Sequence, residues 1–402
     1  MAFVRTYPAS HWESPEAGMK RSSSRLPKGT RSGLHATRVA FILLAQGVIT
    51  VTSSSYLHGT RTWVPLTAAF IGCLAAAGSL AADESLTENP YAPAYGHAYR
   101  HGAVPTREAA QRMRDWEASR PAASRRHRSK TLAFGGGIDG IGVTSGTPKV
   151  YLVFYGSQWS GGGDPNGAAT YLQNLFHGIG TGGEMWSGTM TQYCDGPTVP
   201  RGATTCNPGS TPHVRYPGAG ALAGFWFDTA APSPSQASIA QLAQEAIRGA
   251  AHFGNTTPGA NRYAQYVVVS PSGTHPDGFG QANFCAWHTY TTSSYGDIAF
   301  TNMPYVTDLG ASCGENFVNG GSAGLLDGFS IVNGHEYAET LTDQNPAGGW
   351  TASSGAENGD ECAWISSGQG AAANVSMGNG AYAMQSTWSN DTNECDMSHA
   401  IL

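Results

Sequence analysis

Positively charged side chains are scarce in this chain and stop altogether about two thirds of the way along it. Only 12% of the 402 residues are charged, and 22 Lys+Arg are outnumbered by 28 Asp+Glu. Residues 149–402 hold five basic side chains against 19 acidic ones, and no Lys or Arg follows Arg262. A domain of this charge repels phosphate backbones, which argues against nucleic-acid binding.

Three further features of common protein classes are missing. No two cysteines have the Cys-x-x-Cys spacing of a structural zinc site. The glycine-rich runs at 135–137 and 161–163 lack the Lys-Ser/Thr of a phosphate-binding loop, so nucleotide binding is not expected. The apolar stretches at 39–51 and 64–82 contain polar or small residues and give no clean span of about 20 residues. We therefore expect no permanent membrane span.

The second of these apolar stretches has the features of an export signal. It follows Arg61 and ends in small residues around 79–81 that suit a signal peptidase, so residues 61–82 are predicted to be a signal peptide. The mature protein would begin near Asp83 and be secreted. Residues 1–60 are then an upstream extension or the result of a start placed too early.

Residues 83–148 are expected to be a leader or propeptide-like linker. A segment at 106–120 favours one helix, a basic run follows at 124–130, and three glycines at 135–137 form a flexible joint. Residues 100–130 carry nine Lys/Arg and three Asp/Glu, so this segment could dock on the acidic domain and keep it inactive during export. A disordered linker is the alternative.

Cysteine usage agrees with secretion. Setting aside Cys73 in the predicted signal peptide leaves an even number of cysteines, which suggests three disulfides. Fifteen pairings are possible, of which the sequential one is the simplest, and free thiols are the alternative. The six residues are Cys194, Cys206, Cys285, Cys313, Cys362 and Cys395.

Residues 149–402 are predicted to form one α/β domain. The apolar runs at 150–155 and 263–269 are typical of buried central strands. Segments 168–178 and 235–253 favour helices, the second with an apolar stripe and Ser235 as its N-cap. We expect a central β-sheet flanked by helices and stapled by about three disulfides.

One run near the C-terminus, GHEYAE at 334–339, indicates metal-dependent hydrolysis. On a helix over 325–342, His335 and Glu339 stand at i and i+4 on one face, which allows them to share a cation. Glu336 is then beside the ion as general base on a water molecule, and Glu357 is the third ligand, with Asp360 as an alternate ligand or support. We expect a divalent metal, zinc first, although two carboxylates also suit manganese or calcium. The alternative is a buried helix with a satisfied histidine and solvated acids.

Two other segments contain candidate site residues. His288, in a strand-like segment beside Cys285, is a candidate metal ligand or transition-state donor, and the alternative is a histidine packed among aromatic rings. The run GGSAG at 320–324 matches Gly-x-Ser-x-Gly, but no Asp and His follow it at the spacing of a serine hydrolase triad. A serine mechanism is therefore not expected.

Several blocks occur in an order that resembles the phosphate-induced (EXORDIUM-like) family of secreted plant proteins and its bacterial relatives. These blocks are the strand at 150–157, CAWH at 285–288, the helix at 331–339 with Thr342 and Asn345-Pro346, Trp350, and Glu357-x-x-Asp360-x-Cys362. The resemblance implies an extracellular location and a zincin-like site made of His335, Glu336 and Glu339.

Together these observations predict a secreted metal-dependent hydrolase that acts on protein or peptide substrates. In this interpretation Glu336 and His288 carry the chemistry. The alternative is a non-catalytic protein that binds cell-wall material through exposed aromatic rings. The candidates for such rings are Trp350, Trp364 and Trp388.

Overall fold

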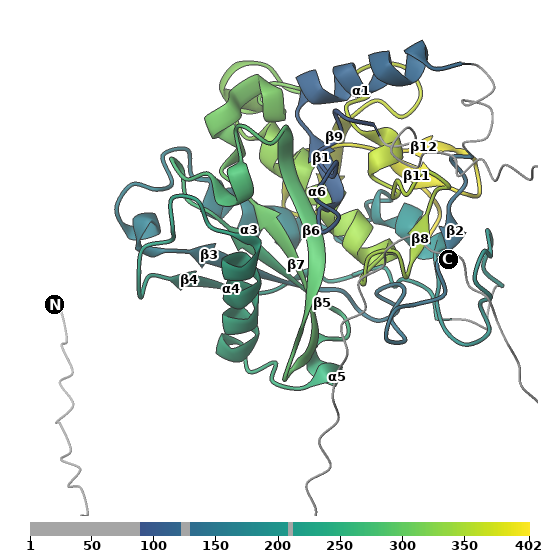
Figure 1. Ribbon diagram of the computed structural model, residues 1–402, viewed down its shortest axis with the longest axis horizontal. Helices are drawn as coiled ribbons and strands as arrows, with labels where there is room; N and C mark the ends of the chain where they lie inside the picture. Colours follow the sequence, from purple (N-terminus) through teal and green to yellow (C-terminus); the bar gives the residue numbers. More distant parts are fainter. Residues whose placement is uncertain (1–88, 122–128, 208–211) are drawn as a thin grey trace, which may run out of the picture. The chain divides into compact units, whose positions relative to one another are not determined.

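The computed structural model describes residues 89–121, 129–207 and 212–402 (Figure 1). The segments predicted to be an upstream extension (1–60) and a signal peptide (61–82) lie outside these residues, as does most of the basic run at 124–130. Within the described part the chain is an α/β protein with a central six-stranded sheet flanked by helices. This confirms the fold class expected from the sequence.

The central sheet is mixed, with strand order β1-β6-β7-β5-β3-β4. Strands β4, β3, β5 and β7 run parallel to one another, whereas β6 is antiparallel to β7 and β1 is antiparallel to β6. The two apolar runs predicted as central strands are β3 and β5, which pair directly. The strands are β1 (His101–Pro105), β3 (Lys149–Tyr155), β4 (Leu222–Asp228), β5 (Ala264–Val269), β6 (Phe284–Ser293) and β7 (Gly296–Met303).

Helices cover both faces of this sheet (Figure 1). Helix α4 packs through Gly249 on Val153 and Tyr266, while Gln265, whose side chain points to the other face, donates to the Glu336 carbonyl of α6. Helix α3 contacts α6 on that second face. The helices are α1 (Arg107–Ser119), α3 (Ala168–Gly178), α4 (Ile239–His252), α5 (Pro258–Asn261) and α6 (Asp327–Thr342).

The helices predicted from the sequence are present in the structure, but α4 does not begin at the expected residue. Helix α4 begins three residues later than expected, because Ser238, not Ser235, is its N-cap. The Ser238 hydroxyl accepts a hydrogen bond from the Gln241 main-chain N–H, and the Gln241 side-chain oxygen accepts one from the Ser238 main-chain N–H. This reciprocal capping box requires Gln three residues after the cap, which Ser235 does not have.

Part of the segment expected to be a leader lies in the fold. Strand β1 forms the edge of the central sheet beside β6, with Val104 fully buried, and α1 follows it. Residues 131–148 also contribute core side chains, among them Leu132 and Val143. The packed structure therefore starts well before residue 149, where the sequence placed the domain boundary. Cleavage of the leader stays a prediction.

The C-terminal part of the chain wraps the side of α6 that faces away from the sheet. The hairpin of β9 (Ala373–Met377) and β10 (Gly380–Met384) contacts α6 directly. Smaller pairs complete this layer: β11 (Thr387–Ser389) with β12 (Glu394–Asp396), and β2 (Ala133–Phe134) with β8 (Trp350–Thr351). No helix in the described ranges is long and apolar enough to cross a lipid bilayer.

All six cysteines of the described ranges are paired, in the sequential pattern. The disulfides are Cys194–Cys206, Cys285–Cys313 and Cys362–Cys395. The second pair brackets the β6–β7 hairpin and holds β6 three residues before His288. The third disulfide joins the segment that carries Asp360 to β12 near the C-terminus. Two of the three disulfides therefore lie next to candidate site residues.

The structure contradicts one expectation about the tryptophans. Trp350, Trp364 and Trp388 are 1%, 8% and 4% exposed, so none of these rings can serve as a platform for polysaccharide. Their indole N–H groups are also used internally, by the Cys194 carbonyl, the Pro105 carbonyl and the Asn390 side chain respectively. These tryptophans are core residues, and the cell-wall-binding alternative loses the observation on which it depended.

Candidate metal centre

Helix α6 is unusual because every one of its residues is buried although many are polar. Charged side chains are almost never fully buried unless they are paired or bind a metal. The helix is anchored at its first turn by Asp327, whose carboxylate accepts from the main-chain N–H groups of Val318 and Asn319. The polar side chains in its second half include His335, Glu336 and Glu339. A buried helix with this content needs a functional explanation.

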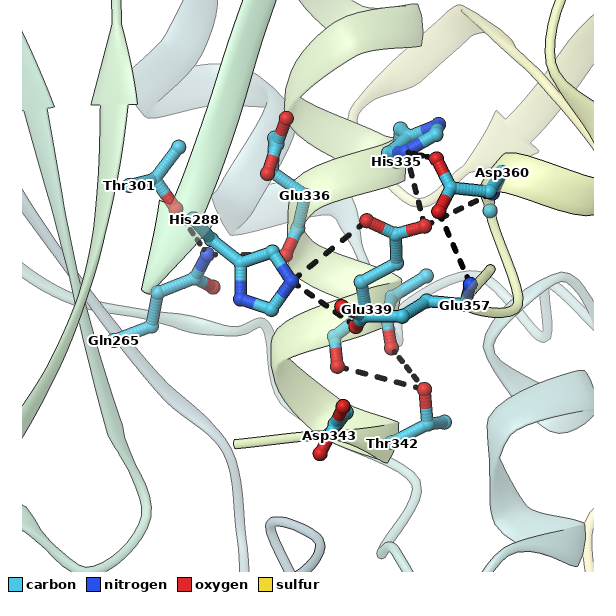
Figure 2. A network of polar contacts seen from close by, with 12 residues as sticks. Gln265, His288, Thr301, His335, Glu336, Glu339, Thr342, Asp343, Glu357 and Asp360 are labelled. Atoms are coloured by element: carbon cyan, nitrogen blue, oxygen red, sulfur yellow. Dashed lines mark hydrogen bonds and ion pairs between the residues drawn. The ribbon is translucent and has the colours of Figure 1, made fainter. Parts of the chain in front are cut away.

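The predicted i, i+4 pair forms as expected from the helical spacing. His335 Nε2 lies 3.0 Å from Glu339 Oε1 and 3.7 Å from Asp360 Oδ1 (Figure 2). Asp360 belongs to a short 3-10 helix, Asp360–Cys362, and its main-chain N–H donates to the same Glu339 oxygen at 2.9 Å. One imidazole nitrogen therefore faces oxygens of two carboxylates.

Gln385 fixes which nitrogen of His335 carries the proton. The Gln385 side-chain amide donates to the carbonyl oxygens of Gly359 and Ser386, at 2.9 and 3.2 Å. Its Oε1 must therefore be the atom 3.1 Å from His335 Nδ1, and it accepts the Nδ1–H. In the neutral ring, Nε2 then has a free lone pair directed at Glu339 and Asp360. This is the arrangement by which an outer residue orients a metal-binding histidine.

His288 reaches the same region from the sheet. Its position in the middle of β6, opposite Thr301 of β7, points the ring at α6. His288 Nε2 lies 3.1 Å from Glu357 Oε2 and 3.8 Å from Glu339 Oε2. The structure thus brings five of the six candidate residues into two groups that share Glu339, and Glu336 belongs to neither group. Asp360 is beside His335, where the sequence predicted Glu357 as the third ligand, and Glu357 lies with His288 instead.

Glu336 is the least satisfied side chain of the cluster. It is 1% exposed, and no side chain among the described residues donates a hydrogen bond to either carboxylate oxygen. Burial, followed by the charges of Glu339 and Asp360, raises its pKa well above the usual range, while the Val104 main-chain N–H acts in the opposite direction. In Figure 2 its carboxylate lies between the strand that carries His288 and the ring of His335.

The pKa values of other acids of the cluster are also raised, which favours their protonated forms. Burial raises the pKa of Glu357 well above its usual range, with neighbouring Asp343 and Glu339 adding to the effect. Burial likewise raises the pKa of Asp360 to about 8 and that of Asp343 to about 7. A bound cation removes this penalty because it balances the carboxylate charges.

The two histidines differ in their protonation. Burial lowers the pKa of His288 well below its usual range, and the charges of His101 and His335 add to this. Burial acts in the same direction on His335, but Glu339 and Asp360 outweigh it and raise its pKa to about 9. A metal ion at Nε2 of His335 replaces the proton that the two carboxylates otherwise attract.

Two glycines bring main chain against the cluster from opposite sides. A Cβ at Gly102 of β1 would overlap Glu339 Oε2 and lie 2.7 Å from His288 Nε2. A Cβ at Gly359 would lie 2.9 Å from Glu339 Oε1 and 3.0 Å from His335 Nδ1. The cluster is therefore closed, and a cavity of about 610 Å³ lies elsewhere, lined by residues such as His213 and Trp350.

Several of these contributors are not recognisable from the sequence. Gln385 lies 50 residues after His335 in no recognisable motif, and Gly102 lies in the segment assigned to the leader. Ser322 of the Gly-x-Ser-x-Gly run lies on an exposed 3-10 turn, Gly321–Gly324, and no hydrogen bond joins it to a histidine in the described ranges.

Comparison with models of known protein families, with curated proteins and with solved structures finds no match to this chain. The resemblance to the EXORDIUM-like family therefore stays an expectation.

Proposed function

We propose that this protein is a secreted metal-dependent hydrolase that cleaves peptide bonds. The observation that carries the proposal is the position of His335 Nε2, whose ring is oriented by Gln385 and which faces oxygens of two carboxylates. Glu336, to which no side chain among the described residues donates, lies next to His335 on the same helix. Perturbed and unsatisfied ionisable groups that converge in this way are typical of functional sites.

The donor set fits a divalent ion. Zinc lies 2.0–2.2 Å from nitrogen and oxygen ligands, so neighbouring ligand atoms of a tetrahedral site are roughly 3.3 Å apart. The separations of His335 Nε2 from Glu339 and Asp360, 3.0 and 3.7 Å, lie on either side of this value. His335, Glu339 and Asp360 would hold the ion, which supplies a positive charge that polarises a carbonyl group and acidifies water.

Glu336 suits the role of general base in this arrangement. It follows His335 directly on α6, and no side chain among the described residues donates a hydrogen bond to either of its oxygens. With a cation balancing the charges of the neighbouring carboxylates, Glu336 would be ionised and could take a proton from water, and its burial would favour keeping that proton until it is passed to the leaving amine. His288, which the sequence assigned to carbonyl polarisation or metal binding, lies on the Glu357 side of the cluster.

The position of β1 favours a peptide as the substrate. Strand β1 is itself an extended peptide, paired antiparallel with β6 so that His101 lies opposite His288 and Gly102 lies against Glu339. Without β1, β6 would be the edge of the sheet, and an extended substrate could add to it in the same way. In this proposal β1 occupies the substrate position and keeps the enzyme latent.

Latency of this kind predicts how the secreted protein is processed. We expect the active secreted form to begin after the basic run at 124–130, and we expect it to hydrolyse denatured protein. A variant with alanine in place of the basic residues of that run should stay uncleaved and have little activity, because β1 remains tethered over the cluster. N-terminal sequencing and a peptidase assay of both proteins measure this. A product that begins at Asp83 and has full activity would contradict the latency.

A further inference from the structure

The two oxygens of Glu339 face different sets of ligands. Oε1 lies 3.0 Å from His335 Nε2, and Oε2 lies 3.8 Å from His288 Nε2 on the other side. Around each oxygen, one histidine and one further carboxylate supply ligand atoms that all lie within 4.8 Å of one another. The first set is His335, Glu339 and Asp360, and the second is His288, Glu339 and Glu357.

Unpartnered atoms point into both sets. His335 Nε2 and Glu339 Oε2 are buried and make no hydrogen bond to the described residues, although both side chains are 0% exposed. Leaving a buried polar atom without a partner costs about 1–3 kcal/mol, more if it is charged. Two such atoms at the centre of a cluster of carboxylates indicate that cations are their partners.

The second set is as well suited to an ion as the first. His288 Nε2 is 3.1 Å from Glu357 Oε2 and 3.8 Å from Glu339 Oε2, again on either side of the roughly 3.3 Å expected between ligands of one ion. Gly102 borders this set as Gly359 borders the other, so main chain closes each of them without a side chain filling the space.

The charge of the cluster favours two bound ions over one. The cluster holds five carboxyl groups, and no Lys or Arg in the described ranges forms an ion pair with any of them: Glu336, Glu339, Asp343, Glu357 and Asp360. One divalent ion balances two of these charges, whereas two ions balance four. Uncompensated buried charges are expensive, so a pair of ions suits this cluster better than one.

We propose that the protein binds two divalent cations, with Glu339 as the carboxylate that bridges them. His335 and Asp360 complete the first site, and His288 and Glu357 complete the second. This inference rests on the proposed function and deepens it. Hydrolases such as aminopeptidases use two metal ions about 3.5–4 Å apart to stabilise both the attacking and the departing oxygen.

The two sites should differ in affinity. Gln385 fixes the ring of His335, whereas Nδ1 of His288 has no hydrogen-bond partner among the described residues. Loss of an outer residue that orients a ligand typically costs 10–100-fold in metal affinity. The site of His288 and Glu357 should therefore be the weaker one and lose its ion first.

Metal stoichiometry tests this proposal. Protein incubated with excess Mn²⁺ and desalted should contain two ions per chain by elemental analysis, and its EPR spectrum should show two exchange-coupled ions. Glu357→Gln, which preserves side-chain shape, and His288→Ala should each reduce the content to one ion and abolish the coupling. The matched controls are Glu394→Gln and His177→Ala, whose side chains are exposed and outside the cluster, and both should keep two ions.

The outcomes separate this inference from the proposed function. One ion per chain in the wild type, unchanged in Glu357→Gln, would overturn the two-ion centre and leave a one-metal hydrolase. Two coupled ions in Glu357→Gln would show that the second site is assigned wrongly. No bound ion in the wild type would overturn the proposed function as well. Glu357→Gln keeps the test valid if His288→Ala fails to fold.

Discussion

Replacing Glu336 with Gln should reduce hydrolysis of denatured protein by about 10²–10⁴-fold, the usual loss when one acid–base group is removed. The amide has the shape of the carboxylate but cannot take a proton from water. The metal content should be unchanged, because His335, Glu339 and Asp360 stay in place. Rate measurements on the processed protein, with elemental analysis of the same samples, test this.

Two variants control for indirect effects of Glu336→Gln. Glu394→Gln makes the same chemical change at an exposed position on β12 and should leave the rate unchanged. His335→Ala should lower metal content and activity together, because it removes a ligand. If Glu336→Gln kept full activity, Glu336 would not be the general base.

Reduction of the three disulfides should destabilise the protein by roughly 10 kcal/mol in the loop-entropy description. The bridges span sequence separations of 12, 28 and 33 residues. Each is then worth about 3–4 kcal/mol, and their sum is comparable to the whole stability of a typical domain, about 5–15 kcal/mol. A phosphine reductant should therefore lower the melting temperature by roughly 20 °C or more, measured by calorimetry.

The disulfides should also matter for the cluster. Cys285 lies on β6 shortly before His288, and Cys362 follows Asp360 in the same 3-10 helix, so reduction frees both segments. Bound metal should be lost together with the fold. The oxidised form of the reductant serves as the control. Alkylation mass spectrometry that found six free thiols in the untreated protein would contradict this account.

The sequence predicted those parts of the structure that depend on local spacing. Helical periodicity was enough to place His335 and Glu339 on one face of α6, and the apolar runs were enough to identify β3 and β5. The sequential disulfides also formed as expected. These features depend on neighbours along the chain or on the simplest closure of loops, which a single sequence records.

Features that depend on distant contacts were not predictable in the same way. The sequence of β1 does not indicate that this segment joins the edge of the central sheet. An edge strand is stabilised by pairing with its neighbour, here β6, and does not need a strong hydrophobic pattern of its own. The role of Gln385 depends on two carbonyl groups that only the folded chain brings within reach. The burial of Trp350, Trp364 and Trp388 was not predictable either, because a single sequence does not record which side of a short strand or turn faces the core.

The metal content of the purified protein tests the central claim most directly. Elemental analysis should find a divalent metal bound to the cluster, and a chelator should remove both the metal and the peptidase activity of the processed form. Zinc, manganese or calcium should then restore that activity. Protein that is metal-free as purified, and that gains no peptidase activity with any of these ions, would contradict the account.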